Sequence, residues 1–135
     1  MTAIASREHT GRLAVLALLL AAACAAVLYE RLVLAVPLAV FLGMFVVVAS
    51  FAVFLRLHRD TWGREGRYVD LWSIAHFLVG ALAFLAGVEL PYLMVISLLW
   101  ELVELAARVH EHPANRAIDV ALAAAGWLVA RAAIA

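Results

Sequence analysis

The sequence has 135 residues, of which 68% are hydrophobic, against roughly 45–50% in a soluble globular domain. Its mean hydropathy is +1.05 and its formal net charge is +0, so the composition argues against a soluble domain and against nucleic-acid binding. A chain this apolar requires a lipid bilayer as part of its solvent, and its length predicts a single transmembrane domain spanning residues 1–135.

Apolar runs separated by short polar segments predict the secondary structure. The first run ends at Glu30-Arg31, a polar loop follows the second at 58–67, and Glu89 with Pro91 marks a turn after the third. A spanning helix needs about 20 residues. The fold class predicted is therefore an all-α, polytopic transmembrane helical bundle with five spans, at about 13–29, 32–57, 71–88, 91–109 and 117–134.

The N-terminal run has a second interpretation. Arg7 and Arg12 precede an apolar stretch that reaches Ala23-Cys24, a pattern that also fits a cleaved signal peptide. The apolar run continues through Cys24 to Leu28, which favours a retained first helix. Cys24 is the only cysteine, so an internal disulfide and a multi-cysteine metal site are excluded.

The arginines predict the orientation of the spans. All ten basic residues are arginine, which together with the abundant alanine and leucine indicates a bacterial chain. With a cytoplasmic N-terminus, Arg31 and Arg131 fall outside and the other eight fall inside, in agreement with the positive-inside rule. The predicted location is therefore the bacterial cytoplasmic (inner) membrane, with several passes.

Ionisable residues inside the last three spans are functional candidates, because charged groups are costly at membrane depth. At 1.5 Å per residue, His76 lies about 9 Å into the third span, and Glu104 and Glu101 lie about 8 and 12 Å into the fourth. Asp119 opens the fifth span from the same side, and Asp70 precedes the third. We expect these five side chains to form one polar cluster near the inner leaflet.

The spacing of these residues assigns them to helix faces. Residues three and four apart share one face of a helix, and small residues let two helices approach closely. We therefore expect the third, fourth and fifth spans to pack together with their polar groups inward. The stripes are Ser73, His76 and Gly80; Ser97, Glu101, Glu104 and Arg108; and Asp119, Ala123, Gly126 and Ala130.

Three interpretations of the polar cluster are open at this point. The cluster could fix the helix register, since buried polar groups in membranes need partners whatever their role. It could bind a lipid head group, with Arg108 and Arg116 contacting phosphate. It could also be a metal or acid–base site. His76, Glu101, Glu104 and Asp119 are the candidate ligands, although no tight metal-binding motif, P-loop or G-x-S-x-G is present.

The stretch from Asp70 to about Ala130 resembles the VanZ-like group of small bacterial membrane proteins and is similar to families of the YjdF type. The residues that carry the resemblance are Asp70 with His76-Phe77, Glu101, Arg116, Asp119 and Gly126. Glu104 stands where the VanZ-like pattern has glutamine, Ala123 stands where it has asparagine, and the spacing from Asp70 to His76 is two residues longer.

The resemblance implies a role in the cell envelope, because VanZ-like proteins are linked to glycopeptide resistance. We expect the protein to bind or modify a lipid or lipid-linked envelope precursor, with membrane lipids as partners. Two other functions are compatible with the sequence: a structural or accessory subunit of a larger membrane complex or homo-oligomer, and a metal-dependent membrane enzyme.

Overall fold

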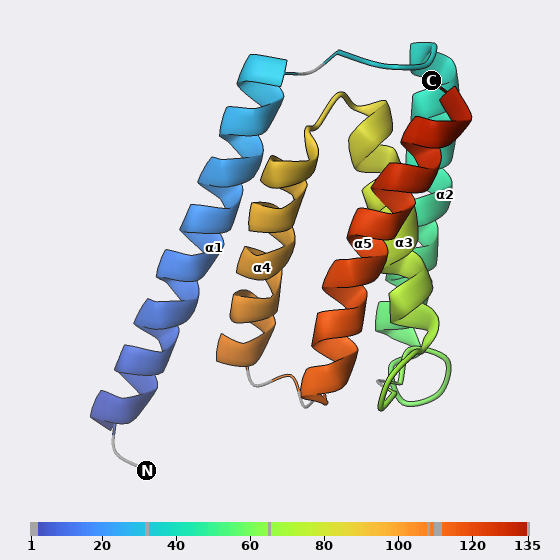
Figure 1. Ribbon diagram of the computed structural model, residues 1–135. Helices are drawn as coiled ribbons and strands as arrows, with labels where there is room; N and C mark the ends of the chain where they lie inside the picture. Colours follow the sequence, from blue (N-terminus) through green and yellow to red (C-terminus); the bar gives the residue numbers. More distant parts are fainter. Residues whose placement is uncertain (1–2, 32, 65, 108, 110–111, 135) are drawn as a thin grey trace.

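The computed structural model describes the backbone at residues 3–31, 33–64, 66–107, 109 and 112–134, and the side chains at these positions except 3–10, 12, 28, 30 and 31. The described part forms five α-helices and no strand. Successive helices run in opposite directions, so the connections alternate between the two ends of the bundle (Figure 1). The helices are α1 (Ala3–Arg31), α2 (Leu38–Leu57), α3 (Leu71–Leu85), α4 (Leu90–Ala106) and α5 (Pro113–Ile134).

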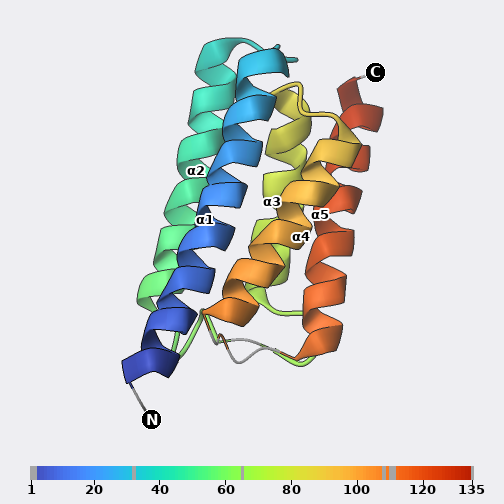
Figure 2. The same cartoon turned by 90° about the vertical axis from the view of Figure 1, so that its left-hand side faces the viewer.

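The helices do not pack in chain order. Helix α1 contacts α4, α4 contacts α5, α5 contacts α3, and α3 contacts α2, so the spatial order is α1–α4–α5–α3–α2. The pair α3–α5 has the most extensive contact, and α3 also touches α4. The described parts of α1 and α2 are not in contact with each other, although both lie on the side of the bundle opposite α5 (Figure 2).

The third helix ends earlier than predicted because a glycine terminates it. Gly87 has a φ of 78°, a left-handed conformation that glycine adopts without steric cost. The amide of Val88 donates to the carbonyl of Ala83 at 2.9 Å, which gives the hydrogen bond typical of a Schellman cap. The predicted span 71–88 is therefore corrected to a helix that stops at Leu85.

Two prolines set helix starts that the apolar runs placed elsewhere. Pro37 is the N-cap of α2, so the helix begins at Leu38 and not at residue 32. Pro113 is the first residue of α5, where its missing amide hydrogen costs no hydrogen bond, so the helix begins four residues before the predicted 117. The ring Nδ1 of His112 accepts a hydrogen bond from the amide of Ala114 at 3.2 Å and satisfies one of the free N–H groups of this helix end.

Helices α1 and α4 also differ from their predicted bounds. Helix α1 is 29 residues long, although its apolar part is Leu13–Val27, and α4 ends at Ala106, three residues before the predicted 109. In the part of the chain that the structure describes, two helices are long and apolar enough to cross a membrane: α2 with 20 residues and α5 with 22. The five predicted spans are thus five helices, of which α2 and α5 meet the length and composition of a span.

Helix α2 exposes most of its apolar side chains. Of its 20 residues only Val48 and Leu55 are buried, whereas Leu42, Val46 and Val47 are all about half exposed or more. Soluble monomers rarely expose apolar patches larger than a few hundred Å². The exposed surface of α2 is therefore typical of a surface that a lipid bilayer or another protein covers.

Candidate functional site

The predicted polar cluster begins at the N-terminus of α3, where Asp70 is the cap. One carboxylate oxygen, Oδ1, accepts hydrogen bonds from the amides of Trp72 at 2.8 Å and Ser73 at 3.1 Å. The hydroxyl oxygen of Ser73 accepts in return from the amide of Asp70 at 3.3 Å, which completes a capping box. The sequence signal for this box is an aspartate three residues before a serine at the start of an apolar run.

The loop before α3 is fixed to both helices that it connects. The amide of Gly66 donates to Asp70 Oδ2 at 2.6 Å, and the indole N–H of Trp72 donates to the carbonyl of Gly63 at 2.9 Å. Gly63 is buried against the end of α2, where a Cβ atom would overlap the carbonyl of Leu55. These contacts hold Asp70 in place relative to α2 as well as α3.

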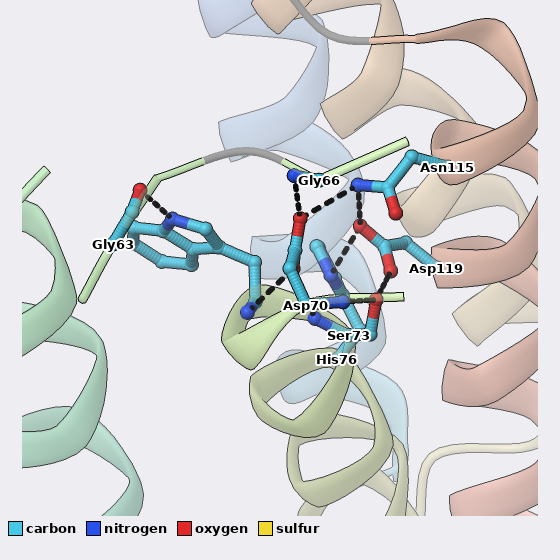
Figure 3. Close-up of polar contacts among 8 residues, drawn as sticks. Gly63, Gly66, Asp70, Ser73, His76, Asn115 and Asp119 are labelled. Carbon is cyan, nitrogen blue, oxygen red and sulfur yellow. Dashed lines mark hydrogen bonds and ion pairs between the residues drawn. The ribbon is translucent and has the colours of Figure 1, made fainter. Parts of the chain in front are cut away.

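Helix α5 completes the cluster with two fully buried polar residues. The side chains of Asn115 and Asp119 are one helical turn apart and point toward α3 (Figure 3). Ser73 Oγ donates to Asp119 Oδ1 at 2.6 Å, and Asn115 Nδ2 donates to Asp70 Oδ2 at 3.1 Å. Ser73 and Asn115 are 0% exposed and Asp119 is 1% exposed, so this part of the network is out of reach of any ligand. Its effect is to lock α3 to α5.

His76 lies at the accessible edge of the network. Its ring nitrogen Nδ1 is 3.3 Å from Asp119 Oδ2, and the imidazole side chain is 20% exposed while that of Asp119 is 2% exposed. Glu101 and Glu104 of α4 are near enough to act electrostatically on His76. Nδ1 is buried and makes no hydrogen bond of normal geometry to a residue that the structure describes, so its contact with Asp119 is an electrostatic one. The carboxylate beside Nδ1 orients the imidazole ring and leaves Nε2 on the side away from Asp119 Oδ2.

Close backbone contact between α3 and α5 brings the polar groups together. A Cβ atom on Gly80 would overlap the carbonyl of Ala123, and one on Gly126 would overlap the carbonyl of Phe77. Each helix therefore uses a glycine where it crosses the other, which is how small residues act in helix pairs. The predicted packing of the small-residue stripe on α5 against the His76 face of α3 is confirmed.

Of the two arginines predicted to bind phosphate, the structure describes Arg116. Arg116 lies in the first turn of α5, and its Nη1 and Nη2 donate to the carbonyls of Glu101 at 3.2 Å and Val109 at 3.0 Å. Arg116 thus joins the first turn of α5 to the last two turns of α4 and to the segment that follows α4, close to a helix end where the dipole favours a cation. The phosphate role of Arg116 stays a prediction, and Arg108 lies outside the described residues.

The structure brings together three of the predicted cluster residues, Asp70, His76 and Asp119, with Glu101 and Glu104 alongside on α4. The candidate metal set of His76, Glu101, Glu104 and Asp119 does not gather as a ligand shell: among the residues that the structure describes, no group of three or more potential ligands could hold a metal ion. The cluster that forms has hydrogen bonds between polar side chains as its main interaction.

Asn115 is the residue that the sequence analysis missed. It joins Asp70 to the α5 carboxylate, since its Nδ2 also lies 3.5 Å from Asp119 Oδ2. The signal that could have found it is its spacing of four residues from Asp119, which places both side chains on one face once α5 is taken to begin at Pro113.

Comparison with known proteins gives no relative with which this site can be compared. No protein-family model matches the chain, and neither a curated protein nor a solved structure matches it.

Proposed function

We propose that the protein is a VanZ-like integral membrane protein that crosses the bacterial cytoplasmic membrane five times with its N-terminus in the cytoplasm. In this proposal the edge of the polar cluster at His76 binds, or helps to modify, the head group of a lipid or lipid-linked envelope component in the inner leaflet. The observation that carries the lipid role is the oriented imidazole, with one nitrogen beside Asp119 and the other available.

Helix packing supports the membrane part of the proposal. Helix α3 lies between α2 and α5, the two helices that are long enough to cross a membrane, and contacts both. Helix α4 in turn contacts α5, and α1 contacts α4. If α2 and α5 cross the bilayer, the other three helices lie at the same depth. Helix α3 is about 22 Å long at 1.5 Å per residue, and a span that is short for the bilayer is accommodated by local thinning.

The distribution of the described arginines supports the orientation. Arg56 is in the last turn of α2 and Arg116 is in the first turn of α5, at the same end of the bundle as the loop that contains Arg59 and Arg64. Arg131 is in the last turn of α5 at the opposite end. Because cytoplasmic ends of membrane proteins carry the excess of arginine, the α2–α3 loop is the cytoplasmic end.

The chemistry around His76 favours a hydroxyl or ammonium group of a lipid head group. The Asp119 carboxylate beside Nδ1 favours the proton of a neutral imidazole on that nitrogen, which makes Nε2 a hydrogen-bond acceptor. The carboxylates of Glu101 and Glu104, which also act on His76, add negative charge to the same edge. Polar groups at membrane depth are stabilised by such partners, so a head group that donates hydrogen bonds fits this edge.

Native mass spectrometry of the protein in a mild detergent tests the proposal. We expect a phospholipid or lipid-linked precursor to stay bound to the wild type and to be lost from His76→Ala, with little change in melting temperature. The matched control is Ile74→Ala on the exposed side of the same helix, where the side chain is 47% exposed. Equal lipid retention in wild type and His76→Ala would contradict a head-group site at this edge.

The VanZ-like part of the proposal has its own test. Expression of the wild-type chain in a susceptible bacterium should lower susceptibility to teicoplanin, and His76→Ala should not. Unchanged susceptibility in a strain that makes and inserts the protein would count against the VanZ-like part of the proposal. The lipid-binding part is tested separately, by mass spectrometry.

A further inference from the structure

A groove runs between α1 and α2, on the side of the bundle away from α5. Its volume is about 410 Å³, and four helices supply its wall. The lining is made of apolar and small side chains, among them Cys24, Phe45, Ala52, Val79, Ala83 and Ile96. Because α1 and α2 do not contact each other in the described part of the chain, the groove opens sideways between them.

The segment that joins α1 to α2 packs against the same end of the bundle as the groove residues Leu82 and Val48. The amide of Ala35 donates to the carbonyl of Leu85 at 2.9 Å, which ties this segment to the end of α3. Val36 packs against the core formed by Val48, Leu82 and Leu85. This end corresponds to the outer side of the membrane in the proposed orientation.

We infer that this groove holds one acyl chain of a glycerophospholipid from the inner leaflet. The inference rests on the proposed membrane insertion. It extends the proposed head-group site, because Val79 in the groove wall follows His76 by one turn, about 4.5 Å along α3. A lipid whose head group contacts His76 can place its chain along Val79 and Ala83.

The chemistry of the lining selects an acyl chain over an extended peptide, and the thiol crosslinking described below separates it from a helix of a second copy. An extended peptide is excluded because the apolar wall would leave its N–H and C=O groups without hydrogen bonds. An acyl chain has no such groups and is present in the bilayer at this depth.

Photo-crosslinking in vesicles tests the inference without any substitution. The wild-type protein is reconstituted in phosphatidylethanolamine and phosphatidylglycerol with a small fraction of phosphatidylethanolamine that carries a diazirine on one acyl chain. After irradiation, mass spectrometry locates the crosslinked residues. We expect crosslinks at Phe41, Ala52 and Ala83, which are partly buried in the groove wall, to exceed those at Val46 and Val47, which face outward on α2. Equal crosslinking of the groove and the outer face of α2 would overturn the inference.

A pair of tryptophan variants on α2 adds a matched control. Ala52→Trp fills the groove and should lower its crosslinks several-fold, whereas Val47→Trp, at a side chain 66% exposed, should leave them unchanged. Folding is checked by elution volume and melting temperature. A folded Ala52→Trp protein that keeps the groove crosslinks would overturn the inference.

Different results would contradict the acyl-chain inference and the head-group proposal. If the head-group proposal alone is wrong, His76→Ala keeps the bound lipid and the groove crosslinks persist. If a second copy of the chain fills the groove, a short thiol crosslinker will join the single Cys24 of two molecules into a dimer, and the acyl-chain inference is overturned. Monomers with groove crosslinks uphold it.

Discussion

Ser73 on α3 donates a hydrogen bond of 2.6 Å to Asp119 on α5, 46 residues later in the chain. Both side chains are buried, and Asp119 is also beside His76. The same carboxylate therefore joins the two most closely packed helices and lies beside the partly exposed imidazole of His76. If the proposed function is correct, stability and ligand binding depend on the same carboxylate.

A double-mutant cycle measures the bond between Ser73 and Asp119. Asp119→Ala leaves the buried hydroxyl of Ser73 without its acceptor, which costs about 1–3 kcal/mol of unfolding free energy. Because the two residues are in contact, the coupling between Ser73→Ala and Asp119→Ala should be about 0.5–3 kcal/mol, read from unfolding in detergent. Val129→Ala, at an exposed side chain of α5, is the control for helix truncation. Additive effects of the two substitutions would show that the bond contributes nothing.

Two glycine-to-alanine substitutions in helices should have opposite outcomes. Gly80→Ala places a methyl group against the Ala123 carbonyl, forces α3 and α5 apart, and costs about 1–3 kcal/mol of unfolding free energy. Gly43→Ala has nothing within 4 Å of the new methyl group and should stabilise α2 by about 0.5–1 kcal/mol. Melting temperatures compared in one detergent give the order Gly43→Ala, wild type, Gly80→Ala. A Gly80→Ala protein as stable as the wild type would refute close contact of the two backbones.

Substitutions of the cap residue Asp70 should accelerate amide hydrogen exchange at the start of α3 in two steps. Asp70→Asn keeps an oxygen for the amides of Trp72 and Ser73 but turns an NH₂ group toward two other donors, Gly66 and Asn115. Asp70→Ala removes both sets of bonds and costs about 0.5–2 kcal/mol as a lost cap. Hydrogen exchange at the Trp72 and Ser73 amides should be slowest in the wild type, faster in Asp70→Asn and fastest in Asp70→Ala. Identical exchange in all three proteins would argue against the cap.

Trp127 should stabilise the turn between α3 and α4. Its indole N–H donates to the Val88 carbonyl at 2.6 Å, and its ring packs edge-on against Phe84 at 5.4 Å. Trp127→Phe keeps an aromatic ring and loses the bond, which we expect to cost about 0.5–1.5 kcal/mol in thermal unfolding. Trp100→Phe is the matched control, because that ring is 43% exposed and makes no hydrogen bond to a described residue. Equal melting temperatures for the two variants would contradict this role.

Local patterns predicted the helices and the inward faces of α3 and α5 well. The spacing of Ser73, His76 and Gly80 on one helix, and of Asp119 and Ala123 on the other, is a local property that follows from 3.6 residues per turn. Small residues on facing stripes then allow close approach, so the pairing could be read from the sequence. The structure confirms this part of the site.

The parts that were not predicted depend on chain ends and on non-local packing. Asn115 was missed because Pro113 was assigned to a loop, although proline suits the first position of a helix as it does at Pro91. The carbonyl partners of Arg116 come from the preceding helix. The groove arises from the spatial order of the helices, in which α1 and α2 are neighbours in sequence and separate in space, and hydrophobic periodicity carries no information about that order.

Reporter fusions measure the number of membrane crossings, which is the central claim. Alkaline phosphatase, active only outside the cytoplasm, and green fluorescent protein, fluorescent inside, are each fused after residue 64 and at the C-terminus. Five crossings from a cytoplasmic N-terminus predict fluorescence at residue 64 and phosphatase activity at the C-terminus. If only α2 and α5 cross, both assignments reverse: phosphatase activity at residue 64 and fluorescence at the C-terminus would contradict the five-span account.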